Sequence, residues 1–124
     1  MADTRRSLGQ RAENLVAERL RETGYTILDR NWRHGQDGEL DLVAQHGTTV
    51  VFIEVRARRG PLEEAVDSAL ESVSANKRAR LIRLAQTYLA VHDLLDSVWR
   101  ITVVAVAYQG ETVAVEIIKD AVEW

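Results

Sequence analysis

Two extended segments joined by a two-residue turn constrain the fold of this 124-residue chain more than any other feature. Residues 38–43 (Gly-Glu-Leu-Asp-Leu-Val) and residues 51–56 (Val-Phe-Ile-Glu-Val-Arg) flank the sequence His-Gly-Thr-Thr at residues 46–49. A Gly-X pair between extended runs is typical of a type II′ β-hairpin, here with Gly47 and Thr48 as the loop. The turn pairs residue 46 with residue 49, and the register of the two strands follows from that pair.

This register predicts a concentration of charge on one face of the hairpin. We expect Asp41 directly opposite Glu54 and Glu39 directly opposite Arg56, with all four side chains on the same face. Two opposed carboxylates about 5 Å apart repel each other. A divalent cation would relieve this repulsion, because hard cations prefer carboxylate oxygens as ligands. The alternative is that the two acids are solvated and neutralised by nearby arginines.

The neighbouring residues favour the metal site over the solvated alternative. Val43 and Phe52 share the acidic face. The opposite face is apolar and carries Leu40, Leu42, Ile53 and Val55. Strands that are apolar on both faces are usually buried on both faces. An acidic pair at such a position is costly without a compensating cation, so the hairpin predicts a metal site at Asp41 and Glu54.

The composition is typical of one soluble domain spanning residues 1–124. Hydrophobic residues make up 46% of the chain and charged residues 28%, and cysteine is absent. The lack of cysteine excludes disulfides and thiolate zinc sites. No apolar run approaches the roughly 18 residues of a membrane span, and residues 1–10 lack the apolar stretch of a signal peptide. We therefore expect a cytoplasmic protein that does not associate with membranes.

The charge distribution is uneven, although the net charge is only −3. Fourteen of the 16 basic residues precede residue 84, which leaves an acidic C-terminal third. A surface that contacts nucleic-acid phosphates must therefore come from the earlier part of the chain. The candidates are Arg30, Arg33, Arg58, Arg59, Lys77 and Arg80. The alternative is that these residues form an ordinary solvated surface.

The periodicity of apolar residues predicts an α/β layer with the element order α-β-β-β-α-β-β. The acidic hairpin is expected to be central in a mixed sheet that helices cover. Ser74 is a candidate N-cap that would divide the long second helix. The expected elements are a helix over 5–23 capped by Gly24, a strand over 25–33, the hairpin, a helical region over 62–91, and strands over 99–108 and 112–119.

Glu13 is the odd member of the first helix. It lies three, four and seven residues before Val16, Ala17 and Leu20, so helical spacing places it on their inward stripe. An acid on an apolar helix face has either a cationic partner or a functional role. Both interpretations stay open on the sequence alone.

The combined pattern resembles the YraN-like uncharacterised family, which has a restriction-endonuclease-like fold akin to that of archaeal Holliday junction resolvases. The resemblance spans most of the chain. The segments that carry it are Gly9-x-x-x-Glu13, Gly24-Tyr25, Arg30-Asn31-Trp32-Arg33, Gly38-Glu39-Leu40-Asp41, Phe52-Ile53-Glu54-Val55, Lys77, Arg80-Leu81 and Tyr88-Leu89.

The resemblance implies roles for particular residues. Asp41 and Glu54 match the metal-binding acids of the D…(D/E)-x-K motif of this nuclease superfamily, with Mg²⁺ or Mn²⁺ as the cofactor. Glu13 matches an acid supplied by the first helix. Arg56 stands where the motif has a lysine that orients the attacking water, and arginine is bulkier and effectively never deprotonates. Lys77 is an alternative source of the missing ammonium group.

Three functions are compatible with these residues. The first is a Mg²⁺-dependent endonuclease that acts on branched DNA as a homodimer, with Glu13, Asp41, Glu54 and Arg56 at its active site. The second is a nucleic-acid-binding module that has lost its chemistry at Arg56. The third is a protein-interaction role for the acidic C-terminal third of the chain.

Overall fold

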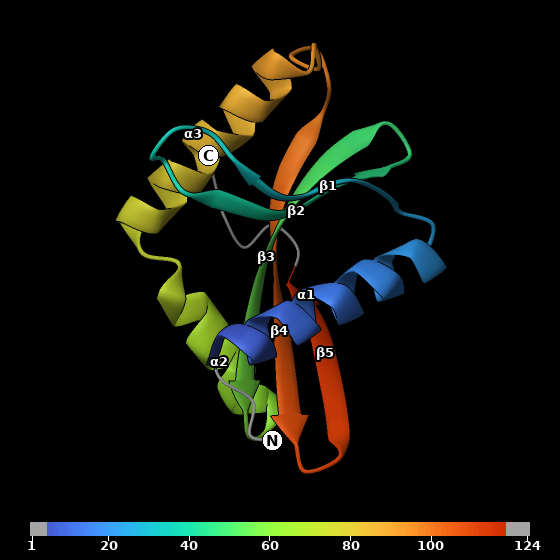
Figure 1. Ribbon diagram of the computed structural model, residues 1–124, viewed down its shortest axis with the longest axis vertical. Coiled ribbons are helices and arrows are strands. Elements are labelled where there is room, and N and C mark those ends of the chain that lie inside the picture. Colours follow the sequence, from blue (N-terminus) through green and yellow to red (C-terminus); the bar gives the residue numbers. More distant parts are fainter. Residues whose placement is uncertain (1–4, 119–124) are drawn as a thin grey trace.

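The computed structural model describes residues 5–118 and contains one five-stranded sheet with helices on both faces (Figure 1). The long helical region over 62–91 is divided into two helices at Ser74, the N-cap position predicted from the sequence. The elements, in chain order, are α1 (Arg5–Glu22), β1 (Thr26–Arg33), β2 (Glu39–His46), β3 (Thr49–Arg59), α2 (Leu62–Ser72), α3 (Ala75–Val91), β4 (Trp99–Gln109) and β5 (Thr112–Ile118). The last predicted strand position, Lys119, lies outside the described residues.

The sheet is mixed, with strand order β1-β2-β3-β4-β5. Among the described strands β3 and β4 are the one parallel pair, and α2 and α3 form the crossover between these two strands. The other neighbours are antiparallel. The α/β class, the mixed sheet and the central position of the hairpin are therefore as predicted.

Side chains alternate along the central strands and build a core on each face of the sheet. α1 packs on one face, where Val16 and Leu20 belong to the same cluster as Ile53. α3 packs on the other face, where Leu84 joins Phe52. α2 continues along that second face over the β3–β4 pair (Figure 1). In the described part of the chain, no helix has the length and apolar character needed to cross a membrane.

Local capping explains where the helices begin and end. Gly24 follows α1 with φ 93°, a left-handed conformation that glycine adopts at low cost, and the Tyr25 amide donates to the Leu20 carbonyl at 2.9 Å. The predicted N-cap at Ser74 is confirmed, because its side-chain oxygen accepts from the Lys77 amide at 3.2 Å. This cap starts α3, which carries Lys77 in its first turn.

The hairpin register is as predicted near the turn and departs from the prediction further along. The ladder runs from His46–Thr49 to Leu42–Ile53, and Gly47 has φ 62° in the turn. Leu40 was expected on the same face as Leu42. It instead packs in the α3 cluster, opposite the face of Leu42. Simple alternation fails here, beyond the Leu42–Ile53 pair at which the β2–β3 ladder ends.

Candidate metal centre

The site lies where β2 separates from β3. The last pair of the hairpin ladder is Leu42–Ile53, so the predicted direct opposition of Asp41 and Glu54 is wrong. Asp41 Oδ2 instead accepts a hydrogen bond from the Val55 amide at 2.9 Å. A side-chain oxygen therefore occupies the place of a backbone carbonyl, and the two strands diverge around it.

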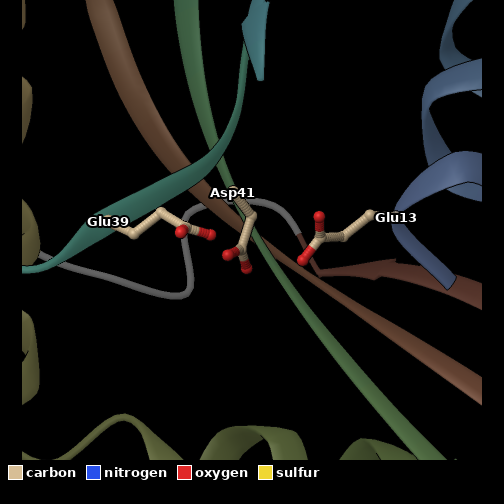
Figure 2. Close-up of side chains that lie close together, drawn as sticks. All are labelled: Glu13, Glu39 and Asp41. Atoms are coloured by element: carbon tan, nitrogen blue, oxygen red, sulfur yellow. The ribbon is translucent and has the colours of Figure 1, made fainter. Parts of the chain in front are cut away.

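Three carboxylates converge at this point (Figure 2). Glu13 reaches in from α1, while Glu39 and Asp41 come from β2. Each residue offers an oxygen atom, and the three oxygens lie within 4.8 Å of one another. All three residues are partly buried. The inward placement of Glu13 was predicted, whereas the sequence interpretation used Glu39 only as a cross-strand partner of Arg56.

Asn31 joins two of these carboxylates. Its side-chain amide nitrogen donates to Glu13 Oε1 at 2.9 Å and to Glu39 Oε1 at 2.8 Å. Arg33 approaches the other side of Glu39 and contacts its Oε2 at 2.9 Å. Asn31 was missed as a site residue, although an asparagine within a strand is itself an unusual choice.

Glu54 lies beside this cluster and is only 4% exposed. Its Oε1 contacts Arg56 Nη2 at 3.2 Å and Lys77 Nζ at 3.3 Å. The other oxygen, Oε2, is buried and has no hydrogen-bond partner among the described residues. The predicted pair of Glu39 with Arg56 is therefore wrong, because Arg56 binds the glutamate of its own strand.

Burial and mutual repulsion change the acidity of the cluster. Burial is the main cause that raises the pKa of Asp41 from 3.8 to about 8, and the charge of Glu54 adds to it. The hydrogen bond from Val55 lowers this pKa but does not offset the two larger effects. Burial also raises the pKa of Glu13, while the hydrogen bond from Asn31 partly opposes the rise. Asp41 is therefore a proton-binding group near neutral pH.

The raised pKa of Asp41 predicts a definite pH dependence of stability. The folded state holds a proton on Asp41 between pH values of about 4 and 8, whereas the unfolded state has released it. The proton bound to Asp41 stabilises the folded state. This stabilisation is complete below pH 4 and is lost as the pH rises through 8. We expect the apoprotein to melt about 5 °C lower at pH 9 than at pH 6, measured by differential scanning calorimetry. The Asp41→Asn variant should show a smaller decrease, and a wild-type Tm that rises over this range would contradict the assignment.

The residues fit a hard divalent cation. Carboxylate oxygens are the ligands that Mg²⁺ and Mn²⁺ prefer, and the cluster supplies them from α1 and β2. Glu54 adds a buried, unpartnered oxygen, which is a costly arrangement unless a ligand or ion completes it. A bound cation would also favour the ionised form of Asp41 over the protonated one.

The basic residues predicted to contact nucleic acid divide into two groups. Arg30 donates to Asn14 Oδ1, Arg33 binds Glu39 and Lys77 binds Glu54, so these three already have partners close to the acidic cluster. The second group is Arg58, Arg59 and Arg80, which lie on β3 and α3 and are exposed, and Arg59 also has an interaction partner. Arg80 also lies against the loop before β2, because its Cδ is 3.3 Å from where a Cβ at Gly38 would be.

Comparison with a solved structure agrees with this architecture. The Holliday junction resolvase Hjc of Archaeoglobus fulgidus is similar with a TM-score of 0.52 and 20% identity, over 90% of this chain and 76% of that chain. At this identity the likeness concerns the fold alone. The mixed five-stranded sheet flanked by helices is therefore restriction-endonuclease-like, as predicted.

Comparison with sequences identifies the family. The model of the family described as "Uncharacterised protein family UPF0102" matches residues 12–106. A UPF0102 protein of Nitratidesulfovibrio vulgaris is 40% identical over 98% of this chain and 87% of the relative. A UPF0102 protein of Chloroflexus aurantiacus is 43% identical over 89% of this chain and 87% of the relative. The chain therefore belongs to the UPF0102 family, also known as the YraN family, as its sequence pattern predicts.

Proposed function

We propose that this protein is a metal-dependent endonuclease that hydrolyses phosphodiester bonds in DNA. The observation that carries the proposal is the buried, unpartnered oxygen of Glu54 beside the crowded carboxylates of Glu13, Glu39 and Asp41. Burial, with added repulsion from Glu54, raises the pKa of Asp41, so an ionised Asp41 is unfavourable in the apoprotein and a divalent cation would stabilise it. The resolvase-like fold supports the same reaction class by analogy.

Three of the acidic residues have proposed roles in binding the cation. Asp41 and Glu54 hold the cation, since one oxygen of each is not used by the strand or by the basic side chains. Glu13 completes the site from α1 or serves a second ion. When bound, Mg²⁺ or Mn²⁺ supplies an activated water and stabilises the charge that develops on the phosphate. Arg56 and Lys77 both supply positive charge beside Glu54. In the superfamily motif a single lysine, at the position of Arg56, supplies this charge.

We propose branched DNA as the substrate and a homodimer as the active form. The similar resolvase is named for a four-way junction, and a two-fold junction is matched by a two-fold dimer. Arg58, Arg59 and Arg80 are exposed candidates for phosphate contacts, and Arg30 and Arg33 lie closer to the acidic cluster. Such contacts position the backbone and read no base sequence.

A second candidate function is a binding module without chemistry. Arg56 and Lys77 both contact Glu54 Oε1, so two cationic groups already compensate this carboxylate without a metal. Arginine at position 56 also removes the group that the motif uses to orient water. This alternative keeps the DNA-binding surface and predicts no cleavage with any divalent ion.

A labelled four-way junction tests the proposal. We expect the wild type to bind the junction more tightly than linear duplex of the same length and to lose affinity steeply with salt. Slow cleavage is expected with Mn²⁺ and Mg²⁺ and should be reduced at least 100-fold in Glu54→Gln. Binding and cleavage are measured separately, by gel shift without metal and by product analysis with each ion.

The outcomes of this assay separate the candidate functions. Asp67→Asn on α2 is a matched control, because it removes an exposed acidic charge outside the cluster. Junction binding without cleavage in every ion would favour the binding module. Absence of junction binding at low salt would overturn both nucleic-acid functions and leave the protein-interaction role.

A further inference from the structure

One asparagine amide connects the two elements that carry the acidic cluster. Asn31 Nδ2 uses one hydrogen for Glu13 on α1 and the other for Glu39 on β2, with distances of 2.9 and 2.8 Å. Glu39 is also held from its other side by Arg33 at 2.9 Å. The contacts therefore run from Arg33 through Glu39 and Asn31 to Glu13. They link the carboxylate of Glu13 on α1 to that of Glu39 on the sheet.

The backbone conformation of Asn31 directs its side chain toward the two carboxylates. Its φ of 52° is left-handed, one of two such values among the described non-glycine residues. Residues 30 and 32 of a regular strand would share a face. Here Arg30 hydrogen-bonds Asn14 on α1, while Trp32 packs in the cluster beneath α3. The strand therefore changes face at Asn31, and the asparagine side chain is presented to the carboxylates at the change.

Two independent requirements meet at this position. The left-handed conformation favours glycine first, then asparagine and aspartate, whose short polar side chains tolerate it. The two carboxylates require a donor with two hydrogens, which aspartate and glycine lack. Asparagine satisfies both requirements, and glutamine or alanine would satisfy at most one of them.

We propose that Asn31 is a positioning residue of the metal centre: its amide holds Glu13 and Glu39 in the arrangement that binds the cation. The proposal rests on the proposed metal-dependent function. The amide nitrogen of Asn31 donates hydrogen bonds and does not coordinate the cation, so Asn31 acts through Glu13 and Glu39. Residues that orient the ligands of a metal commonly change its affinity by about 10- to 100-fold when they are replaced.

Two substitutions separate the amide from the backbone. Asn31→Gly keeps the left-handed conformation and removes the amide, whereas Asn31→Ala removes the amide and also strains the backbone. We expect both variants to bind Mn²⁺ about tenfold more weakly than the wild type in isothermal titration. Both variants should lower the Tm of the apoprotein because both lose the amide, and Asn31→Ala should lower it by about 3 °C more than Asn31→Gly. If Asn31→Gly binds Mn²⁺ as tightly as the wild type, the amide has no positioning role and the proposal is overturned.

Asp93 provides a matched control for the backbone effect. It is exposed, follows α3 and has φ 56°, the other left-handed value among the described non-glycine residues. Asp93→Ala should melt at a lower temperature than Asp93→Gly, as is expected at position 31. Neither variant should change the affinity for Mn²⁺. A similar loss of affinity in Asp93→Gly would mean that the titration reports general stability, and the proposal would fall.

A double-mutant cycle keeps this proposal separate from the proposed function. The Tm of the apoprotein is measured for Asn31→Gly, Glu13→Ala and the double variant, without any metal. If Asn31 holds Glu13, the loss of Tm caused by Asn31→Gly is smaller when Glu13 is already absent. Additive changes overturn the positioning role. A wild type that binds no Mn²⁺ would instead overturn the proposed function, while non-additive changes would still support the link between Asn31 and Glu13.

Discussion

The Asp41→Asn variant is expected to melt higher than the wild-type apoprotein and to lose the rise in Tm that Mg²⁺ gives the wild type. The asparagine carbonyl can still accept the hydrogen bond from Val55, which is 2.9 Å from the Asp41 oxygen. The substitution removes the buried charge and its repulsion with Glu54, the two main causes of the raised pKa of Asp41. At pH 8 we expect a gain of about 1 kcal/mol, or roughly 4 °C.

The loss of metal response should be the larger of the two effects. At a Mg²⁺ concentration of about 100 times Kd, the wild type gains roughly 2.7 kcal/mol of stability, and the variant should gain almost none. Thermal scans with and without Mg²⁺ measure both quantities, and Asp67→Asn serves as the surface control. A marked destabilisation of the Asp41→Asn apoprotein would show that Asp41 is a structural acid held by an internal cation.

Arg56→Lys is expected to increase the rate of DNA cleavage. The guanidinium of Arg56 contacts Glu54 Oε1 at 3.2 Å, and its Nε is buried without a hydrogen-bond partner among the described residues. It is therefore a bulky group whose hydrogen bonds are incompletely used. A lysine ammonium is more compact and matches the role that the family motif implies. An increase of about 10- to 100-fold in the single-turnover rate is expected, since a single well-placed donor is worth that much or more.

A matched substitution controls for this gain. Arg78→Lys makes the same change at an exposed position of α3 that is outside the cluster and the proposed DNA contacts, and it should leave the rate unchanged. Junction affinity is measured for each variant, so that a change in binding is not mistaken for a change in chemistry. Unchanged cleavage in Arg56→Lys, with unchanged binding, would contradict the assignment of position 56.

The sequence predicts the elements well because their signals are local. The Gly47-Thr48 turn sets the register of the hairpin, and the Ser74 cap marks the start of α3. The helical spacing of Glu13 with Val16 and Leu20 predicts its inward position. Each of these features depends on residues close to one another in the chain, so periodicity and capping preferences are sufficient to find them.

The errors have a common physical origin in contacts that periodicity does not encode. Extending the hairpin register assumed that backbone pairing continues, whereas the Asp41 side chain takes the Val55 amide and ends the ladder. Regular alternation likewise placed Leu40 on the wrong face. Asn31 was missed because its role depends on a left-handed φ and on two partners from distant segments. Only the three-dimensional structure brings these groups together.

The bond between Asp41 and the Val55 amide has a consequence for how relatives of this protein are to be interpreted. One oxygen of Asp41 maintains the separation of β2 from β3, so the fold itself favours a hydrogen-bond acceptor at this position. A relative with asparagine there would keep the strand geometry and lose the charge. An acid at position 41 therefore points to a role beyond folding, because asparagine would accept the same hydrogen bond without the buried charge. Glu54 points the same way, since its buried Oε2 has no hydrogen-bond partner among the described residues, a cost to folding that a bound ion would offset.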